Sequence, residues 1–211
     1  IRDCLLSRGL GDVYKRQIGV NGTGKTTLLK IIAKINEPDK GQIICGNGIR
    51  VSYLPQNPEF PKKQSILEYV MDGKEHQDWK TESEAKTILT KLGIYDFDEG
   101  CDHLSGGQKK RVALARTLVD PTEVLILDEP TSGLDSLIKR RFKDLLVEEN
   151  QKGATIFFCN HDIGEVQELC GRTAIIRKGS ILEVANTDNL SSSDTRRVKL
   201  KTTDNLSALF T

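Results

Sequence analysis

The chain contains a glycine-rich segment whose residue types and spacing could bind phosphate groups. Residues 19–26 read Gly-Val-Asn-Gly-Thr-Gly-Lys-Thr and fit the pattern G-x-x-x-x-G-K-[ST]. In such a loop, the glycines let successive backbone N–H groups face the β- and γ-phosphates, the lysine adds a positive charge, and the threonine hydroxyl can ligate Mg²⁺. The pattern predicts a nucleotide site, and we expect these residues to form it: Asn21, Gly22, Thr23, Gly24, Lys25, Thr26 and Thr27.

Further along the chain, an apolar segment ends in two acidic residues. Residues 124–127 read Val-Leu-Ile-Leu and are followed by Asp128 and Glu129. Because the carboxyl end of a buried strand faces the phosphate loop in nucleotide-binding sheets, we expect Asp128 to bind Mg²⁺. We expect Glu129 to polarise a water molecule for attack on the γ-phosphate. Two solvated loop acids are the alternative, and the glycine-rich loop argues against it.

A second segment predicts another anion site at the start of a helix. Residues 104–108 read Leu-Ser-Gly-Gly-Gln and precede a helical pattern, and the hydroxyl and backbone N–H groups there can receive an anion. The expected contacts are Ser105, Gly106, Gly107 and Gln108. One nucleotide seldom uses two such sites about 80 residues apart in one chain, so we expect this one to clamp a nucleotide held by another copy. We interpret Lys109 and Lys110 as part of a solvated helix face.

The elements that must position these residues alternate between short apolar runs and amphipathic patterns. This alternation predicts an α/β fold with a mostly parallel sheet flanked by helices. A small helical subdomain is expected at about residues 57–103, where capping boxes at Ser65 and Thr81 open two helices and Gly93 ends the second. The other expected helices are 26–34 and one around 138–146, and the expected strands are 42–45, 49–54, 124–127, 154–159 and 173–176.

Composition and charge exclude several function classes. The chain has 211 residues, of which 31 are basic and 30 acidic, so its bulk charge does not favour nucleic acid and we expect no direct DNA binding. No apolar run approaches the roughly 18 residues of a spanning helix, and there is no signal-peptide pattern. The five cysteines are scattered without zinc-site spacing, which is typical of reduced thiols in a cytosolic protein.

The three motifs, GVNGTGKT, LSGGQ and VLILDEP in that order, resemble those of an ATP-binding cassette (ABC) ATPase over residues 18–190. The resemblance implies a P-loop NTPase fold, ATP as substrate, and Mg²⁺ as cofactor. It also implies roles for Gln56, which would sense Mg²⁺ and the attacking water, for Asp135, which would cross a dimer interface, and for His161, which would contact the γ-phosphate. Family members form head-to-tail dimers in which the phosphate loop of one ABC ATPase domain and the LSGGQ segment of a second one sandwich each ATP.

The two halves of the chain resemble different branches of that family. Residues 18–122 are similar to ABC-F proteins, which are soluble translation factors, whereas residues 128–190 are similar to the ATPase subunits of drug-exporter-type transporters. The second resemblance implies a subunit that powers export through a separate membrane permease and lies in the cytoplasm, peripheral to the inner face of the cell membrane. The alternatives are an ABC-F cassette that acts on the ribosome, or a hybrid of the two joined inside LILDEPT. A binding module without catalysis is disfavoured because Lys25 and Glu129 are both present.

The residues before the phosphate loop do not fit a buried parallel strand. Residues 12–17 read Asp-Val-Tyr-Lys-Arg-Gln and resemble the translated end of a transposase adaptor used to prepare DNA libraries. We therefore interpret 1–17 as a non-native leader and 191–211 as an incomplete C-terminal tail. A genuine edge-like strand is the alternative. On the first interpretation the antiparallel strands of an intact cassette are missing, and weak ATP binding with slow hydrolysis is expected.

Overall fold

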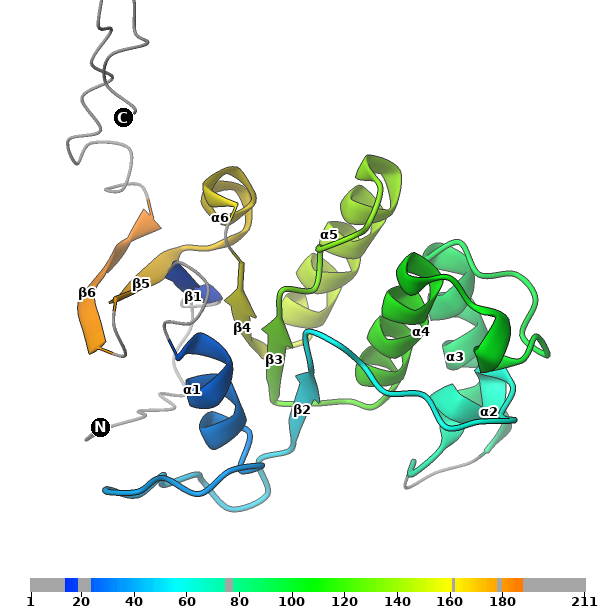
Figure 1. Cartoon of the computed structure of the whole chain (residues 1–211), viewed down its shortest axis with the longest axis horizontal. Helices are drawn as coiled ribbons and strands as arrows, with labels where there is room; N and C mark the ends of the chain where they lie inside the picture. Colours follow the sequence, from blue (N-terminus) through cyan, green and yellow to red (C-terminus); the bar gives the residue numbers. More distant parts are fainter. Residues whose placement is uncertain (1–13, 19–23, 75–77, 161, 178–179, 188–211) are drawn as a thin grey trace, which may run out of the picture.

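The computed structural model describes residues 14–18, 24–74, 78–160, 162–177 and 180–187. Within these ranges the chain alternates between helices and strands (Figure 1). The strands are β1 Tyr14–Ile18, β2 Val51–Leu54, β3 Val124–Asp128, β4 Thr155–Cys159, β5 Arg172–Arg177 and β6 Ser180–Asn186. The helices are α1 Lys25–Ile32, α2 Ile66–Met71, α3 Trp79–Lys91, α4 Gly106–Val119, α5 Ser136–Gln151 and α6 Ile163–Leu169, with a 3₁₀ turn, η1, at Cys101–His103.

The strands form one mostly parallel sheet in the described part of the chain. Their order is β2-β3-β4-β1-β5-β6, and every neighbouring pair is parallel except β5 and β6. The predicted fold class is confirmed. The antiparallel strand β6 was not expected from the sequence, which had placed the last core strand at residues 173–176.

Strand β1 occupies an interior position although its sequence reads Tyr-Lys-Arg-Gln-Ile. Its backbone pairs in parallel with β4 on one side and β5 on the other. Backbone N–H and C=O groups make the same ladder whatever side chains they carry, so a polar segment can complete a sheet when it precedes the loop. Backbone pairing alone therefore accounts for the interior position of β1, whatever its side chains are. The adaptor interpretation of residues 12–17 stays a hypothesis.

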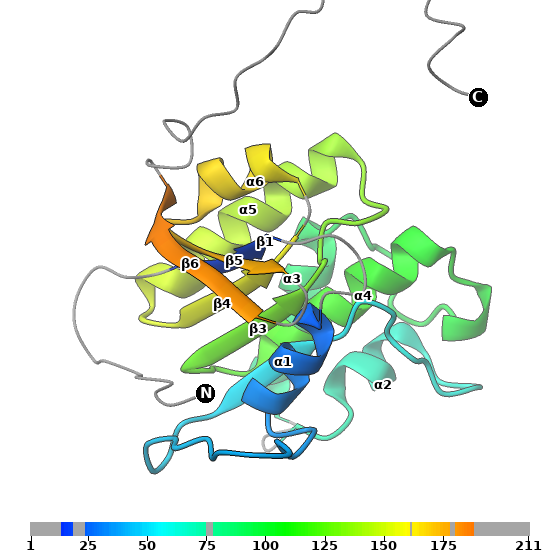
Figure 2. The ribbon, with the colours of Figure 1, turned by 60° about the vertical axis from the view of Figure 1, so that its left-hand side comes forward.

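The central strands are buried on both faces, which explains their apolar sequences. Along β3, Leu125 and Leu127 pack in an apolar cluster with residues of α4, α5 and α6. Val124 and Ile126 alternate with them and pack in a second cluster with Leu29 of α1. Figures 1 and 2 show the same two layers, with α1 on one face of the sheet and α5 and α6 on the other.

Two expected elements differ in the structure. Residues 42–45 form no strand, and Ile44 is 71% exposed, so the segment lacks both a pairing partner among the described residues and an apolar face to cover it. The helix expected to open at Thr81 begins earlier, because Asp78 is its N-cap and its carboxylate accepts the Thr81 N–H at 2.9 Å. The predicted capping box at Thr81 is therefore wrong.

Helices α2 and α3 lie within the helical insert expected at about 57–103, and both pack against α4, which follows the insert. The capping box at Ser65 is confirmed, since Ser65 and Glu68 exchange hydrogen bonds between side chain and backbone. Tyr69 of α2 stacks on Phe60 with ring centroids 4.3 Å apart, and Arg116 of α4 lies over the Tyr69 ring. The boundaries of the insert as a subdomain stay a prediction.

An exposed ion pair fixes the starts of β2 and β3 and has a testable pH dependence. Glu123 accepts hydrogen bonds from the Arg50 backbone N–H at 2.8 Å and from its guanidinium at 2.9 and 3.3 Å. These bonds from Arg50 lower the pKa of Glu123 to about 2. Because the folded pKa lies below the unfolded value, the stabilisation is present above about pH 4.5 and is lost as the pH falls toward 2.

We expect Glu123→Gln to lower the free energy of unfolding by about 0.5–1 kcal/mol at pH 7, the range for a half-exposed pair. The difference from wild type should shrink at pH 3. Urea unfolding followed by circular dichroism measures both values, with the exposed Glu37→Gln as control. A difference that is equal at the two pH values would contradict the assignment.

Candidate nucleotide-binding site

The strand ends that precede Gln56 and Glu129 meet at the carboxyl edge of the parallel strands. Leu54 pairs with Leu127, and Asp128 pairs with Cys159, so the ends of β2, β3 and β4 lie side by side. Helix α1 begins near the same edge, since the charge of its first residue, Lys25, acts on Cys159 at the end of β4. The predicted contacts Asn21, Gly22, Thr23 and His161 lie outside the described residues and stay predictions.

The first turn of α1 carries the described part of the phosphate loop. Gly24 is the N-cap with φ of 88°, a left-handed conformation that favours glycine over residues with a Cβ. Lys25 is buried, Thr26 is half-buried and Thr27 is exposed. The start of this helix therefore carries a buried lysine, whose charge acts on Cys159 next to Asp128, followed by two hydroxyl-bearing residues.

Gln56 and Glu129 are joined directly, although 73 residues separate them in the chain. The Gln56 side-chain amide donates a hydrogen bond from Nε2 to Glu129 Oε2 at 3.0 Å. Glu129 is buried and has φ of 47°, an uncommon conformation for a residue with a side chain. Its backbone N–H donates to the Cys159 carbonyl at 2.8 Å, which ties the turn after β3 to the end of β4. Backbone strain of this kind concentrates at functional sites.

Asp128 is the most deeply buried acid of the site, with 1% of its surface exposed. Among the residues that the structure describes, its Oδ2 atom has no hydrogen-bond partner, and neither has the hydroxyl of Tyr53. Burial and the neighbouring Asp128 raise the pKa of Tyr53, and the same two causes raise the pKa of the Cys159 thiol to about 12. Asp128 therefore has two neutral groups beside it, and the charge of Lys110 also acts on it. A buried carboxylate oxygen is a ligand of the type that Mg²⁺ prefers.

Lys110 is buried and does not lie on a solvated face, so that interpretation is wrong. Only 5% of its surface is exposed, and its ammonium donates to the Gln56 backbone carbonyl at 2.7 Å. Desolvation lowers the pKa of Lys110, and the charges of Asp128 and Glu129 oppose that shift. The sequence pattern of α4 does not distinguish its buried positions from its solvated ones, so the burial of Lys110 could not be predicted from it. Lys109 is half-buried, with its ammonium 6.0 Å from the Phe60 ring centroid.

The LSGGQ segment opens α4 as the sequence predicts. Ser105 is the N-cap, its hydroxyl oxygen accepts the Gln108 N–H at 3.3 Å, and the Gln108 side chain accepts the Ser105 N–H at 2.9 Å. A Cβ at Gly107 would come within 3.3 Å of the Gly133 carbonyl, so the segment packs closely on the loop that precedes α5. Asp135 is the N-cap of α5 and accepts the Ile138 N–H at 3.0 Å.

Four residues beside the site were not singled out from the sequence. Thr131, Lys139, Asn160 and Glu165 form a hydrogen-bonded cluster between the ends of β3 and β4 and the starts of α5 and α6. Burial raises the pKa of Glu165, but hydrogen bonds from Lys139, Thr131 and Asn160 outweigh burial and hold that pKa below its usual value. Only the positions of Thr131 after Asp-Glu-Pro and of Asn160 before His161 could have indicated them.

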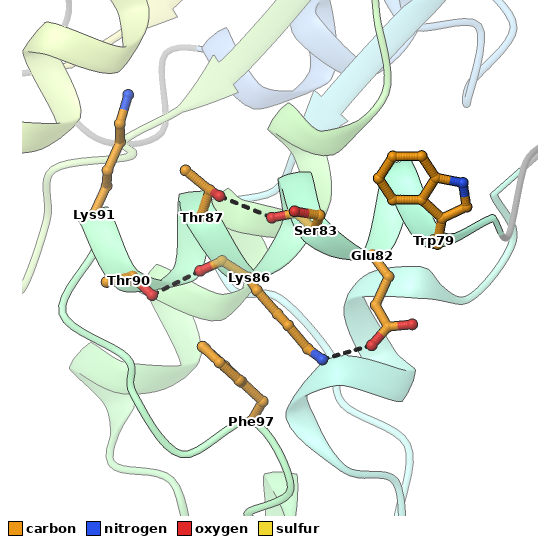
Figure 3. Close-up of a pocket in the computed structure, with 8 residues that line it drawn as sticks. All are labelled: Trp79, Glu82, Ser83, Lys86, Thr87, Thr90, Lys91 and Phe97. Atoms are coloured by element: carbon orange, nitrogen blue, oxygen red, sulfur yellow. Dashed lines mark hydrogen bonds and ion pairs between the residues drawn. The ribbon is translucent and has the colours of Figure 1, made fainter.

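A groove of about 590 Å³ lies elsewhere, on α3 (Figure 3). Its lining includes Trp79, which is 81% exposed, and Phe97, together with Lys86 in an ion pair with Glu82. None of the predicted nucleotide contacts lines it. Within the described ranges, no helix combines the length and apolar character needed to cross a bilayer.

Comparisons with known proteins agree with this geometry. The ABC transporter family profile matches residues 17–132, which is more than half of the chain. The aliphatic sulfonates import ATP-binding protein SsuB 1 of Shouchella clausii is 37% identical over 175 residues, covering 82% of this chain and 69% of SsuB 1. The uncharacterized ABC transporter ATP-binding protein YfmR of Bacillus subtilis is 31% identical over 202 residues, covering 78% of this chain.

The chain spans only 32% of the length of YfmR. A solved structure of an ATP-binding subunit of an ABC transporter superposes with a TM-score of 0.78, covering 85% of this chain and 81% of its own, at 22% identity. That likeness shows the fold, which is the P-loop NTPase fold of ABC ATPases. None of these matches supports the ABC-F alternative or a ribosomal partner. By its family profile, its relatives and its fold, the chain belongs to the ABC transporter family as an ATP-binding domain, for which ATPase activity is expected.

Proposed function

We propose that the chain binds and hydrolyses ATP as the ATP-binding subunit of an ABC transporter, powering transport through a separate membrane permease. The observation that carries this proposal is the 3.0 Å hydrogen bond between Gln56 and Glu129, next to the buried Asp128 and the start of α1. It brings segments that are far apart in the chain to one edge of the sheet, where open α/β sheets bind their ligands.

ATP would lie at the start of α1, with its phosphates on the N–H groups of residues 21–27 and on the Lys25 ammonium. The N-terminus of α1 favours negative charge, and burial of Lys25 strengthens its attraction for phosphate because less water screens it.

The residues present also fit Mg²⁺. Asp128 offers a buried carboxylate oxygen without a partner among the described residues, Thr26 offers a hydroxyl, and Gln56 offers an amide oxygen. Oxygen ligands of this kind are those that Mg²⁺ prefers. The cation would neutralise charge on the phosphate oxygens.

Glu129 would act on the attacking water. Gln56 donates a hydrogen bond to one carboxylate oxygen of Glu129. The Glu129 backbone N–H donates to the Cys159 carbonyl, which fixes the turn that carries Glu129. A carboxylate fixed in this way can orient a water molecule toward the γ-phosphate and take its proton as the new oxygen–phosphorus bond forms and the bond to the ADP leaving oxygen breaks. His161 is proposed to contact the γ-phosphate.

A second ABC ATPase domain would complete the site. The LSGGQ segment opens α4, Asp135 opens α5, and Gly107 packs close to Gly133 just before Asp135. We propose that these helix starts face the nucleotide of a head-to-tail partner. A permease would hold the chain at the inner face of the cell membrane. We propose export as the direction, on the resemblance of residues 128–190 to drug-exporter subunits, whereas SsuB 1 is named for import.

A binding experiment separates the transporter from the ribosome alternative. The purified chain is incubated with vesicles that contain the permease encoded nearest its gene and, separately, with ribosomes, and each mixture is sedimented with and without ATP. We expect association with the permease vesicles alone. The chain and the ATP are outside the vesicles and act on the cytoplasmic face of the permease, so ATP-dependent accumulation of the transported compound inside the vesicles would support export. ATP-dependent release from loaded vesicles would overturn the proposed direction, and binding to ribosomes alone would overturn the transporter proposal.

A further inference from the structure

A single buried carboxylate joins the segments that carry three of the proposed site residues. Glu165, in the first turn of α6, accepts a hydrogen bond from the Thr131 hydroxyl at 2.6 Å through Oε2. The same oxygen accepts a hydrogen bond from the Asn160 side-chain amide at 2.5 Å, and Oε1 accepts the Lys139 ammonium at 2.7 Å. Asn160 also donates to the Thr131 hydroxyl oxygen at 2.9 Å, which closes the cluster.

Each donor lies close in the chain to a proposed functional residue. Thr131 is two residues after Glu129, and Asn160 immediately precedes His161. Lys139 lies in the first turn of α5, and its backbone N–H donates to the carbonyl of the N-cap residue Asp135 at 2.9 Å. The Glu165 side chain therefore bonds to the segments that carry Glu129, His161 and Asp135. These are the residues proposed to polarise the water, contact the γ-phosphate and cross the dimer interface.

Burial makes this connection rigid. Thr131 and Asn160 each have 2% of their surface exposed, and Glu165 has 8%. Hydrogen bonds to a charged acceptor are roughly twice as strong as neutral ones, and a buried network whose members are bonded fixes its side chains in one arrangement. The carboxylate has no role in the phosphate chemistry proposed above, so its place in the interior calls for another explanation.

We propose that Glu165 is a positioning residue for ATP hydrolysis, which sets the turn bearing Glu129 and the segment bearing His161 relative to each other. This inference rests on the proposed ATPase function. In the proposed function the phosphates lie at α1, on the opposite face of the sheet from α6 (Figures 1 and 2). The loss of Glu165 should therefore slow the chemical step and leave ATP binding nearly intact. A misplacement of about 1 Å at a reacting group can cost about 100-fold in rate.

The test compares Glu165→Gln with a matched control in the same pair of helices. Glu168 of α6 forms an ion pair with Lys143 of α5 on the exposed surface, so Glu168→Gln removes a pair between the same elements without touching the cluster. In Glu165→Gln, when the amide oxygen accepts the hydrogen bonds of Thr131 and Asn160, the amide NH₂ faces the Lys139 ammonium. Both of these groups are donors, so the bond to Lys139 is lost. We expect kcat to fall about 10-fold or more, with KM within about twofold of wild type, and no change for Glu168→Gln.

Thr131 supplies a second pair of variants in case Glu165→Gln folds poorly. Thr131→Ser keeps the hydroxyl and should retain kcat, whereas Thr131→Val removes it and should lower kcat. Amide hydrogen exchange should quicken in peptides covering residues 127–134 and 157–166 in Glu165→Gln but not in Glu168→Gln. This readout does not require turnover.

The outcomes separate this inference from the function on which it rests. Wild-type turnover no faster than that of Glu129→Gln would overturn the proposed ATPase function. Wild-type turnover above that level, together with an unchanged kcat in Glu165→Gln and Thr131→Val, would overturn the positioning role alone. Unchanged hydrogen exchange in those peptides would likewise contradict the positioning role of Glu165.

Discussion

Glu129→Gln lowers the kcat for ATP hydrolysis by about 100-fold or more and leaves ATP affinity within about twofold of wild type, if Glu129 acts on the attacking water. The amide has nearly the shape of the carboxylate, and its oxygen can still accept the Gln56 Nε2–H that bonds Glu129 at 3.0 Å. The substitution thus removes basicity and charge while it keeps the contact. Phosphate release measures kcat, and fluorescent-nucleotide titration measures affinity.

Because ATP would remain uncleaved, the same variant should accumulate the nucleotide-bound dimer. Size-exclusion chromatography with light scattering should show a larger dimer fraction for Glu129→Gln with ATP than for wild type. Glu148→Gln is the control, since Glu148 lies on the surface of α5 in an exposed ion pair with Lys91. A Glu129→Gln variant that hydrolyses ATP at the wild-type rate would remove Glu129 from the mechanism.

Lys25→Met has the second large effect, and it concerns binding. The ammonium is buried at the first residue of α1, where the N–H groups of the helix start also point. Hydrogen bonds to charged groups contribute about 1.5–3 kcal/mol, so the loss of this cation should weaken ATP binding about 10- to 100-fold. Methionine keeps the apolar stem packed and therefore limits the change to the charge.

The matched control lies on the same helix. Lys30 is in the last turn of α1, away from the sheet edge where the site lies, and Lys30→Met should bind ATP as wild type does. Thermal unfolding of both variants without nucleotide checks that folding is retained. Equal ATP affinities for Lys25→Met and wild type would show that the phosphates lie elsewhere.

The sequence predicts the local structure around the candidate site well where the proposed chemistry and the local structure use the same residues. The apolar run of β3 had to be a buried strand, and its final acids therefore had to lie at the sheet edge. Ser105 and Gln108 form a capping box, so the start of α4 could be predicted from two residue types three positions apart. In both cases local pattern and tertiary packing favour the same structure.

Prediction fails where tertiary contacts decide. Lys110 belongs to a basic run, and only the carbonyl of a distant segment explains its burial. The cluster around Glu165 joins residues 34 positions apart, and no local pattern encodes such a pairing. Residues 42–45 have strand-like composition but lack a partner among the described residues, because β-structure depends on pairing more than on propensity.

The hydrogen bond from Lys110 to residue 56 has a consequence for how this region can change. Its acceptor is a main-chain carbonyl, which every amino acid provides, so the bond between α4 and the segment after β2 is independent of the side chain at position 56. The two hydrogen bonds of that residue can therefore be removed separately: a substitution of Gln56 removes the one to Glu129, and a substitution of Lys110 removes the one to the helix that begins with LSGGQ. Each half of the path between the acid and that helix can be altered while the other half is kept.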